Sequence, residues 1–318
     1  MKQADFERAY GESWTAFEQW LTQPDGEAMS ADQVPQTYRK ICHHLALARA
    51  RNYSAGLEDR LNRLALEGHR ALYAARASGV SNLWRFFARD FPRSVRKNWV
   101  IVLFAAVLFY GPFLAMLGAA ITKPTLVYSI ISPDDAATYA EMYSDDASRF
   151  GARDSGDDLL MFGYYIFNNI GIGFRTFASG ALIGIGALYV VFTNGLVIGT
   201  VVGHVTAQGL GHNIWPFVSG HSAFELNAIV LAGAAGLKLG FSFFAPGRRR
   251  RTDALRHAAS EAMPIVYGFT AMLLGAAFIE AFWSSTTWPP AAAKYSVAAV
   301  LWLFVLLYFS LAGRARGS

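Results

Sequence analysis

Cysteine and charge are both scarce in this sequence. Cys42 is the only cysteine among 318 residues, and charged residues make up 16% of the chain. One thiol cannot form an internal disulfide or a multi-thiolate zinc site, so both are excluded, and we expect Cys42 to be a small buried apolar residue. Soluble domains average roughly 25% charged residues. The shortage of charge excludes an ordinary soluble protein, and the 53% of hydrophobic residues exclude disorder.

The beginning of the chain also lacks an apolar leader. Its first residues are polar and charged, whereas a secretory signal needs an apolar stretch of about 7 to 15 residues. We therefore expect the N-terminus to stay in the cytoplasm. The net charge of +5 could suit nucleic acid, but the basic residues flank apolar runs. Orientation signals of membrane proteins lie at such positions, so we expect no nucleic-acid partner.

Apolar residues recur at helical spacing before position 98. The three stripes cover residues 6–21, 38–48 and 57–72. Spacings of three and four predict amphipathic helices, and together they predict a small cytoplasmic helical domain over residues 1–98. Trp14, Phe17 and Trp20 are candidate docking aromatics, but we favour their burial in the core of the bundle. Residues 80–99 mix aromatic and basic side chains. This segment is either a fourth bundle helix or a basic amphipathic helix at the inner membrane surface.

Five apolar runs are long enough to cross a bilayer. They cover residues 99–121, 177–205, 221–244, 264–283 and 295–312. Residues 99–313 are therefore predicted to form a polytopic membrane domain. The acidic loop at 122–158 has few lysines and arginines, which places it outside.

Five crossings conflict with the basic residues. They would leave the arginines at 248–251 and the basic tail at 314–318 outside, against the positive-inside rule. A sixth crossing at 159–174 puts both basic segments and both termini in the cytoplasm. This segment is short and contains Asn168 and Asn169, so we expect a tilted or broken helix, with a re-entrant hairpin as the alternative. The predicted fold is an all-α integral membrane protein with six crossings.

Ionisable residues at membrane depth are the main functional candidates. His221 and Glu225 share a helix face, Lys238 follows on the same helix, and Glu280 lies in the next span. We favour a structural His–Glu pair over proton or ion coupling and over a metal site. A metal-dependent hydrolase would need His221, Glu225 and another ligand, and the metalloprotease pattern His-Glu-x-x-His is absent. We therefore predict no metal and no cofactor.

Recognisable catalytic patterns are lacking as well. The sequence has no Gly-x-Ser-x-Gly elbow and no phosphate-binding P-loop, so we predict that the protein is not an enzyme. Small residues repeat every fourth position at 195–203 and 228–240. Such faces let helix backbones approach closely, and we favour packing within one chain. Asn194 and Gly195 form a candidate hinge or half-helix junction.

Several of these segments resemble the stage II sporulation protein M family. They are residues 167–170 (FNNI), 192–196 (FTNGL), 220–229 (GHSAFELNAI) and 233–240 (GAAGLKLG). Residues 38–42 (YRKIC) and 45–49 (LALAR) also resemble the longer, non-sporulation members. Asn227 stands where we expect proline in the family.

The resemblance implies a scaffold. In endospore formers the family member is a multi-span membrane protein that assembles with a lytic transglycosylase and an amidase-type partner to remodel the septal wall. We therefore predict a non-enzymatic scaffold in the bacterial inner membrane, in contact with lipids and with protein partners such as cell-wall hydrolases or a second copy of itself. The alternative is an ion-coupled transporter or channel lined by residues 159–174, Asn194, Gly195, His221 and Glu225.

Overall fold

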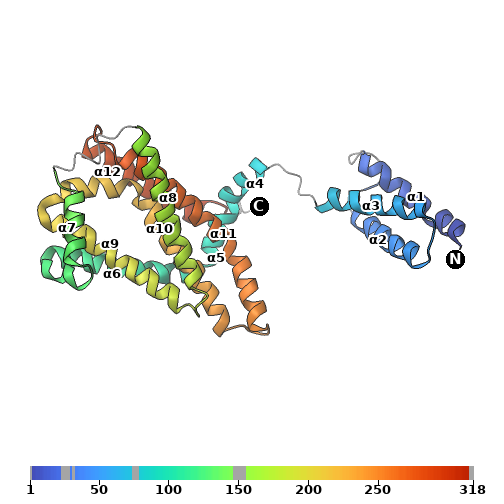
Figure 1. Cartoon of the computed structure of the whole chain (residues 1–318), viewed down its shortest axis with the longest axis horizontal. Helices are drawn as coiled ribbons and strands as arrows, with labels where there is room; N and C mark the ends of the chain where they lie inside the picture. The colour runs from blue at the N-terminus through green and yellow to red at the C-terminus, as the bar shows by residue number, and fades with distance from the viewer. Residues whose placement is uncertain (1, 23–28, 31–32, 74–78, 146–154, 315–318) are drawn as a thin grey trace. The chain divides into compact units, whose positions relative to one another are not determined.

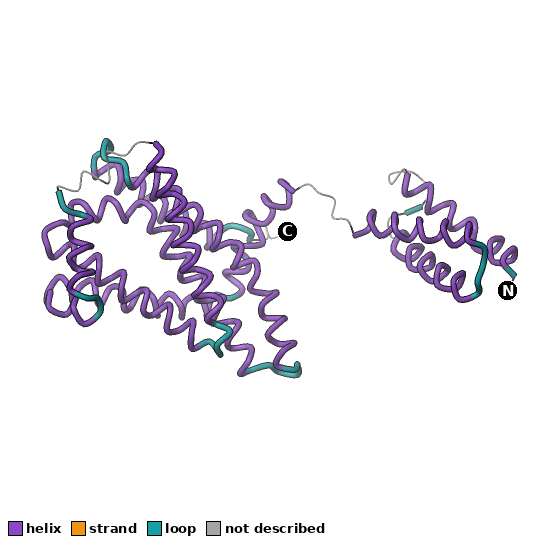
Figure 2. Tube along the Cα trace, viewed as in Figure 1, coloured by secondary structure: helices purple, strands orange, loops and turns teal. Residues whose placement is uncertain are grey.

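The computed structural model describes residues 2–22, 29–30, 33–73, 79–145 and 155–314. Within these ranges the regular structure is helical and contains no strand (Figure 2). The chain divides into two compact units, Met1–Ser81 and Asn82–Ser318. These units divide at residue 81, whereas the domain boundary predicted from the sequence follows residue 98.

The first unit is a three-helix bundle of α1 (Gln3–Thr22), α2 (Val34–Ala50) and α3 (Ala55–Tyr73) (Figure 1). The side chains of Trp14 and Phe17 are fully buried in its core, and Trp20 packs against that core. The docking role of Trp14 and Phe17 is thus wrong, because aromatic residues at helical spacing fill the bundle interior. Cys42 is half-buried rather than buried.

Residues 82–98 belong to the second unit. They contain the end of α4 (Gly79–Arg85), the π-helical turn η1 (Phe86–Asp90) and α5 (Phe91–Lys97). The ring of Phe91 packs on Gly268, and the guanidinium groups of Arg93 and Arg96 donate to carbonyl oxygens at the end of α12 (Ala291–Leu311). Those carbonyls have no partner inside their helix. The alternative of a fourth bundle helix is therefore wrong.

Nine further helices and helical turns lie between α5 and α12 in the described residues. They are α6 (Trp99–Thr122), η2 (Pro124–Ser129), α7 (Pro133–Met142), α8 (Ser155–Ser179), α9 (Ile185–Val205), α10 (Gly211–Phe244) and α11 (Arg251–Ile279), with π-helical turns η3 (Thr206–Leu210) and η4 (Glu280–Ser284). Four described stretches are long and apolar enough to cross a membrane: Trp99–Thr122, Ile185–Phe244, Arg251–Ser284 and Ala291–Leu311. The second contains two helices, because Gly209 has a φ of 85° between α9 and α10.

Two predicted span boundaries are wrong. The apolar run at 177–205 is divided by a turn at 180–184, where Ile183 and Gly184 have positive φ, so its first residues belong to α8. Residues 159–174 lie inside α8, which is one uninterrupted helix of 25 residues. A broken segment and a re-entrant hairpin are both excluded there. α9 is likewise helical through Asn194 and Gly195, so these residues form no junction.

Glycine contacts give the relative directions of the helices. Gly195 lies on the backbone of Phe109 and Gly203 on that of Leu117, so α6 and α9 run in the same direction. Cβ atoms at Gly195 and Gly199 would overlap backbone carbonyl oxygens of α6, which shows how closely the two helices approach. The prediction that the small residues at 195–203 pack within the chain is confirmed.

α9 and α10 form an antiparallel hairpin. Gly184 at the start of α9 lies on Gly240 near the end of α10, and Val191 lies on Gly233. α10 and α11 are also antiparallel, because the ion pair between Lys238 and Glu261 lies far along α10 and early in α11. α8 opposes α11, since Tyr165 clusters with Ala281 while Gly173 lies on Phe269. Thus α6, α9 and α11 share one direction, and α8 and α10 share the other.

Candidate functional site

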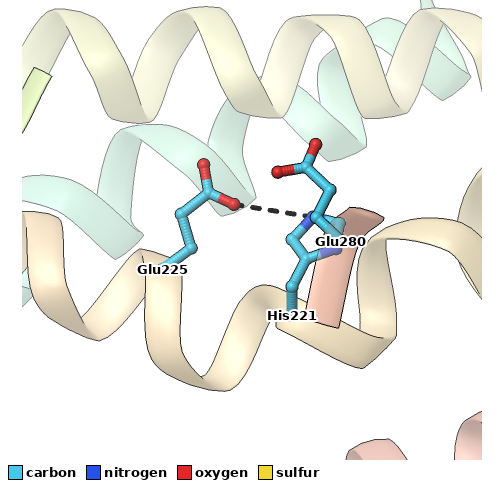
Figure 3. Close-up of side chains that lie close together, drawn as sticks. All are labelled: His221, Glu225 and Glu280. Atoms are coloured by element: carbon cyan, nitrogen blue, oxygen red, sulfur yellow. Dashed lines mark ion pairs between the residues drawn. The ribbon is translucent and has the colours of Figure 1, made fainter. Parts of the chain in front are cut away.

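Three ionisable side chains from two helical segments meet inside the second unit. His221 and Glu225 lie one turn apart on α10, and Glu280 begins the π-helical turn η4 (Figure 3). One nitrogen or oxygen atom from each residue lies within 4.8 Å of the others. The imidazole Nε2 of His221 and Oε2 of Glu225 are 3.5 Å apart. We refer to His221, Glu225 and Glu280 as the His–Glu cluster.

The turn η4 carries two groups that face the cluster. Its first residue supplies the Glu280 carboxylate, and its last residue supplies the Ser284 hydroxyl, 3.1 Å from Nδ1 of His221. A π-helical turn adds one residue to a helical turn and is common at functional sites. Gly220 permits this approach, because a Cβ there would lie 2.9 Å from the Ser284 hydroxyl.

α8 supplies two side-chain amides that lie next to the His–Glu cluster. The side-chain amide of Asn169 donates to Oε2 of Glu280 over 3.3 Å. Asn168 donates in turn to the side-chain oxygen of Asn169 over 3.2 Å. Asn169 is buried, so its amide is held in place by these two contacts. The two asparagines singled out in the sequence therefore position a carboxylate.

Two further side chains, those of Phe217 and Lys294, lie next to the His–Glu cluster or to the turn that carries it. The phenyl ring of Phe217 lies edge-on to the imidazole of His221, with ring centres 5.5 Å apart. The ammonium group of Lys294, which is also buried, donates to the backbone carbonyl of Ser284 over 2.8 Å. This bond fixes the end of η4. In the described part of the chain, no lysine or arginine forms an ion pair with Glu225 or Glu280.

The cluster places two carboxyl groups and one imidazole in a largely buried position. His221 has a side chain that is 7% exposed, and the side chain of Glu225 is 16% exposed. Two carboxylates and one imidazole lie together where few water molecules can solvate them. Ionised carboxylates in such surroundings require a counter-charge, either a proton or a bound cation. The arrangement can therefore hold protons or a positive ion.

The remaining candidate residues lie elsewhere. The Asn194 amide donates to the carbonyl of Val190 in its own helix, and Gly195 serves helix packing. Lys238 contacts Asn98 over 2.9 Å and Glu261 over 3.0 Å, near the opposite end of α10. The structure thus separates Asn194, Gly195 and Lys238 from the His–Glu cluster, includes Glu280 in it and places Asn169 in hydrogen-bond contact with Glu280.

Comparison with known protein families identifies the family of the second unit. Residues 100–285, more than half of the chain, match stage II sporulation protein M. The chain belongs to the stage II sporulation protein M family. Residues 4–74 match a domain of unknown function, which corresponds to the three-helix bundle. Comparison with curated proteins and with solved structures gives no match.

The family region contains the whole His–Glu cluster together with Asn169 and Ser284. Family membership and the four apolar stretches identify a membrane protein. Ser284 and Lys294 were not among the predicted site residues. A serine in an apolar segment carries no signal by itself, and Lys294 sits at the start of α12, where a lysine commonly marks a membrane border.

Proposed function

We propose that this family member is a non-enzymatic scaffold in the bacterial inner membrane that assembles protein partners, cell-wall hydrolases among them. The observation that carries the proposal is the backbone contact between α6 and α9. Gly195, Gly199 and Gly203 bring α9 onto the α6 backbone over three successive turns. Helices locked in this way resist sliding, which suits a fixed frame that orients other proteins.

The proposed topology has six crossings and both termini in the cytoplasm. Parallel α6 and α9 support it, because the chain must return between them, and α8 with 25 residues spans about 37 Å. Arg96, Lys97 and the arginines at 248–251 lie at one end of these helices, and the acidic residues of α7 lie at the other. Lysine and arginine favour the cytoplasmic side.

Thiol labelling tests the topology. In a Cys42→Ser background, we expect a membrane-impermeant reagent to label Ala137→Cys on intact spheroplasts, because exposed Ala137 lies on α7. Thr252→Cys, which is exposed at the basic end of α11, should react only after lysis. Labelling of Thr252→Cys on intact spheroplasts would contradict the proposed orientation.

Partner capture tests the scaffold function. The tagged full-length protein is purified from native membranes in a mild detergent, and the bound proteins are identified by mass spectrometry. We expect a defined envelope protein in constant ratio, recovered again when that partner carries the tag. Recovery of the tagged protein without any bound protein, in every detergent tested, would overturn the scaffold proposal.

The buried cluster favours a second candidate, an ion-coupled transporter. Ionisable groups at membrane depth mark ion pathways in many transporters. Purified protein in liposomes distinguishes the two functions, because a transporter moves protons or a solute without any partner. Flux that is abolished by Glu225→Gln would favour transport over scaffolding.

A further inference from the structure

We propose that His221, Glu225 and Glu280 bind a divalent transition-metal ion, with Zn²⁺ as the ion that fits them best. The proposal is independent of the scaffold function. It begins from the donor set, one imidazole nitrogen and two carboxylates, all of which are known zinc ligands. Figure 3 shows the three side chains directed toward a common region between α10 and η4.

The spacing of the donor atoms suits one ion. Zinc bonds to nitrogen and oxygen are about 2.1 Å long, so two ligands on a tetrahedral ion lie about 3.4 Å apart. His221 Nε2 and Glu225 Oε2 are already 3.5 Å apart. A ligand atom of Glu280 lies within 4.8 Å of one from each of the other two residues. A side-chain rotation that moves the Glu280 oxygen by up to about 1.4 Å would complete three bonds and leave the fourth position open.

The surrounding hydrogen bonds orient the ligands for such an ion. Ser284 contacts Nδ1 of His221, which directs Nε2 toward the carboxylates. Metal-binding histidines commonly donate their other ring N–H to a neighbouring acceptor. Asn169 holds Oε2 of Glu280 and leaves its second carboxylate oxygen for the ion. Three segments, α8, α10 and η4, thus supply and orient the donor set.

The charge of a divalent cation matches the two carboxylates of the site, as two protons would. One proton leaves a net negative charge on two carboxylates, whereas a divalent ion neutralises both. The neutral imidazole then serves as the third ligand without adding charge. Ca²⁺ fits less well because it takes six to eight oxygen ligands, and one donor here is nitrogen.

Metal binding by the purified full-length protein tests the proposal. The protein is stripped with a chelator, and Zn²⁺ is titrated by calorimetry, with Ca²⁺ in a parallel titration. We expect one equivalent of Zn²⁺ with little binding of Ca²⁺. The conservative substitutions Glu225→Gln and Glu280→Gln should each weaken the affinity at least about tenfold, as should His221→Ala. Thermal unfolding without metal checks that each variant is folded.

Histidines outside the cluster provide matched controls. His212→Ala and His257→Ala remove a histidine without touching the cluster and should retain one equivalent of Zn²⁺. Zinc X-ray absorption spectroscopy of the wild-type protein should report one imidazole ligand together with oxygen ligands. This measurement requires no variant. Binding of less than about a tenth of an equivalent, or equal loss in His257→Ala and Glu280→Gln, would overturn the proposal.

Discussion

The close backbone contact between α6 and α9 can be tested by adding a single methyl group. Gly199→Ala adds a Cβ that would lie 2.9 Å from both the Cα and the carbonyl carbon of Phe113 and would overlap the carbonyl oxygen. Ordinary contact begins at 3.4 Å. The obstacle is backbone, which cannot rotate away, so α6 must retreat by about 1 Å before the overlapping carbonyl oxygen reaches ordinary contact. A gap of about 1 Å forfeits up to roughly half of the dispersion energy of the affected contacts.

The expected loss of stability follows from two opposing effects. Overpacking of this kind costs about 1–3 kcal/mol, and replacement of glycine by alanine inside a helix returns up to about 1 kcal/mol. We therefore expect Gly199→Ala to lower the free energy of unfolding by about 1–2 kcal/mol. The midpoint of unfolding in mixed micelles of increasing SDS content measures this change.

Gly118→Ala is the matched control for this measurement. Gly118 lies on α6, and a Cβ there would meet no atom within 4 Å. The same substitution in the same helix pair should therefore be neutral or slightly stabilising. Equal midpoints for Gly199→Ala and Gly118→Ala would refute the argument that backbone contact locks α6 to α9.

Two further predictions concern hydrogen bonds outside the cluster. Arg96→Ala removes a guanidinium group that donates to two carbonyl oxygens at the end of α12, over 2.8 and 2.6 Å. Amide hydrogen exchange in the last turn of α12 should therefore become faster in Arg96→Ala. Lys97→Ala is the control and should leave this exchange unchanged. Burial holds the pKa of His44 below its ordinary value, and the neutral Nδ1 accepts the indole N–H of Trp14. The unfolded chain then binds the proton more readily, so the first unit should lose stability as the pH falls below about 6.5. Amide hydrogen exchange of α1 and α2, corrected for the intrinsic rate, should show this loss of stability in the wild type. Corrected exchange that does not depend on pH would contradict the prediction. So would a loss of the same size in His44→Gln.

The sequence predicted most helices but missed the turn between α8 and α9. Residues 177–205 are apolar throughout, so hydropathy detects no boundary there. In the turn at 180–184, Gly180 lies on the backbone of Gly236 and Gly184 on that of Gly240, whereas the apolar side chains of Leu182 and Ile183 are exposed. The glycines at 180, 184 and 186 were the available signal, because only glycine permits such close backbone contact.

The candidate site was predictable only in part. His221 and Glu225 could be paired from their spacing on one helix, and Glu280 could be selected because it is ionisable and lies in an apolar run. Their meeting could not be predicted, because it depends on the register of α10 against α11 and on the extra residue of η4. Spacing describes one helix at a time, and a site built between helices needs their packing.

The arginines of α5 have a consequence for biosynthesis. Arg93 and Arg96 precede the first long apolar helix, yet the carbonyl oxygens that they bind belong to residues 309–313. During translation these guanidinium groups emerge more than two hundred residues before their acceptors. The arginines of α5 can therefore find these partners only after α12 has been made, and a nascent chain stalled before α12 would hold α5 by its apolar contacts alone, such as that of Phe91 with Gly268.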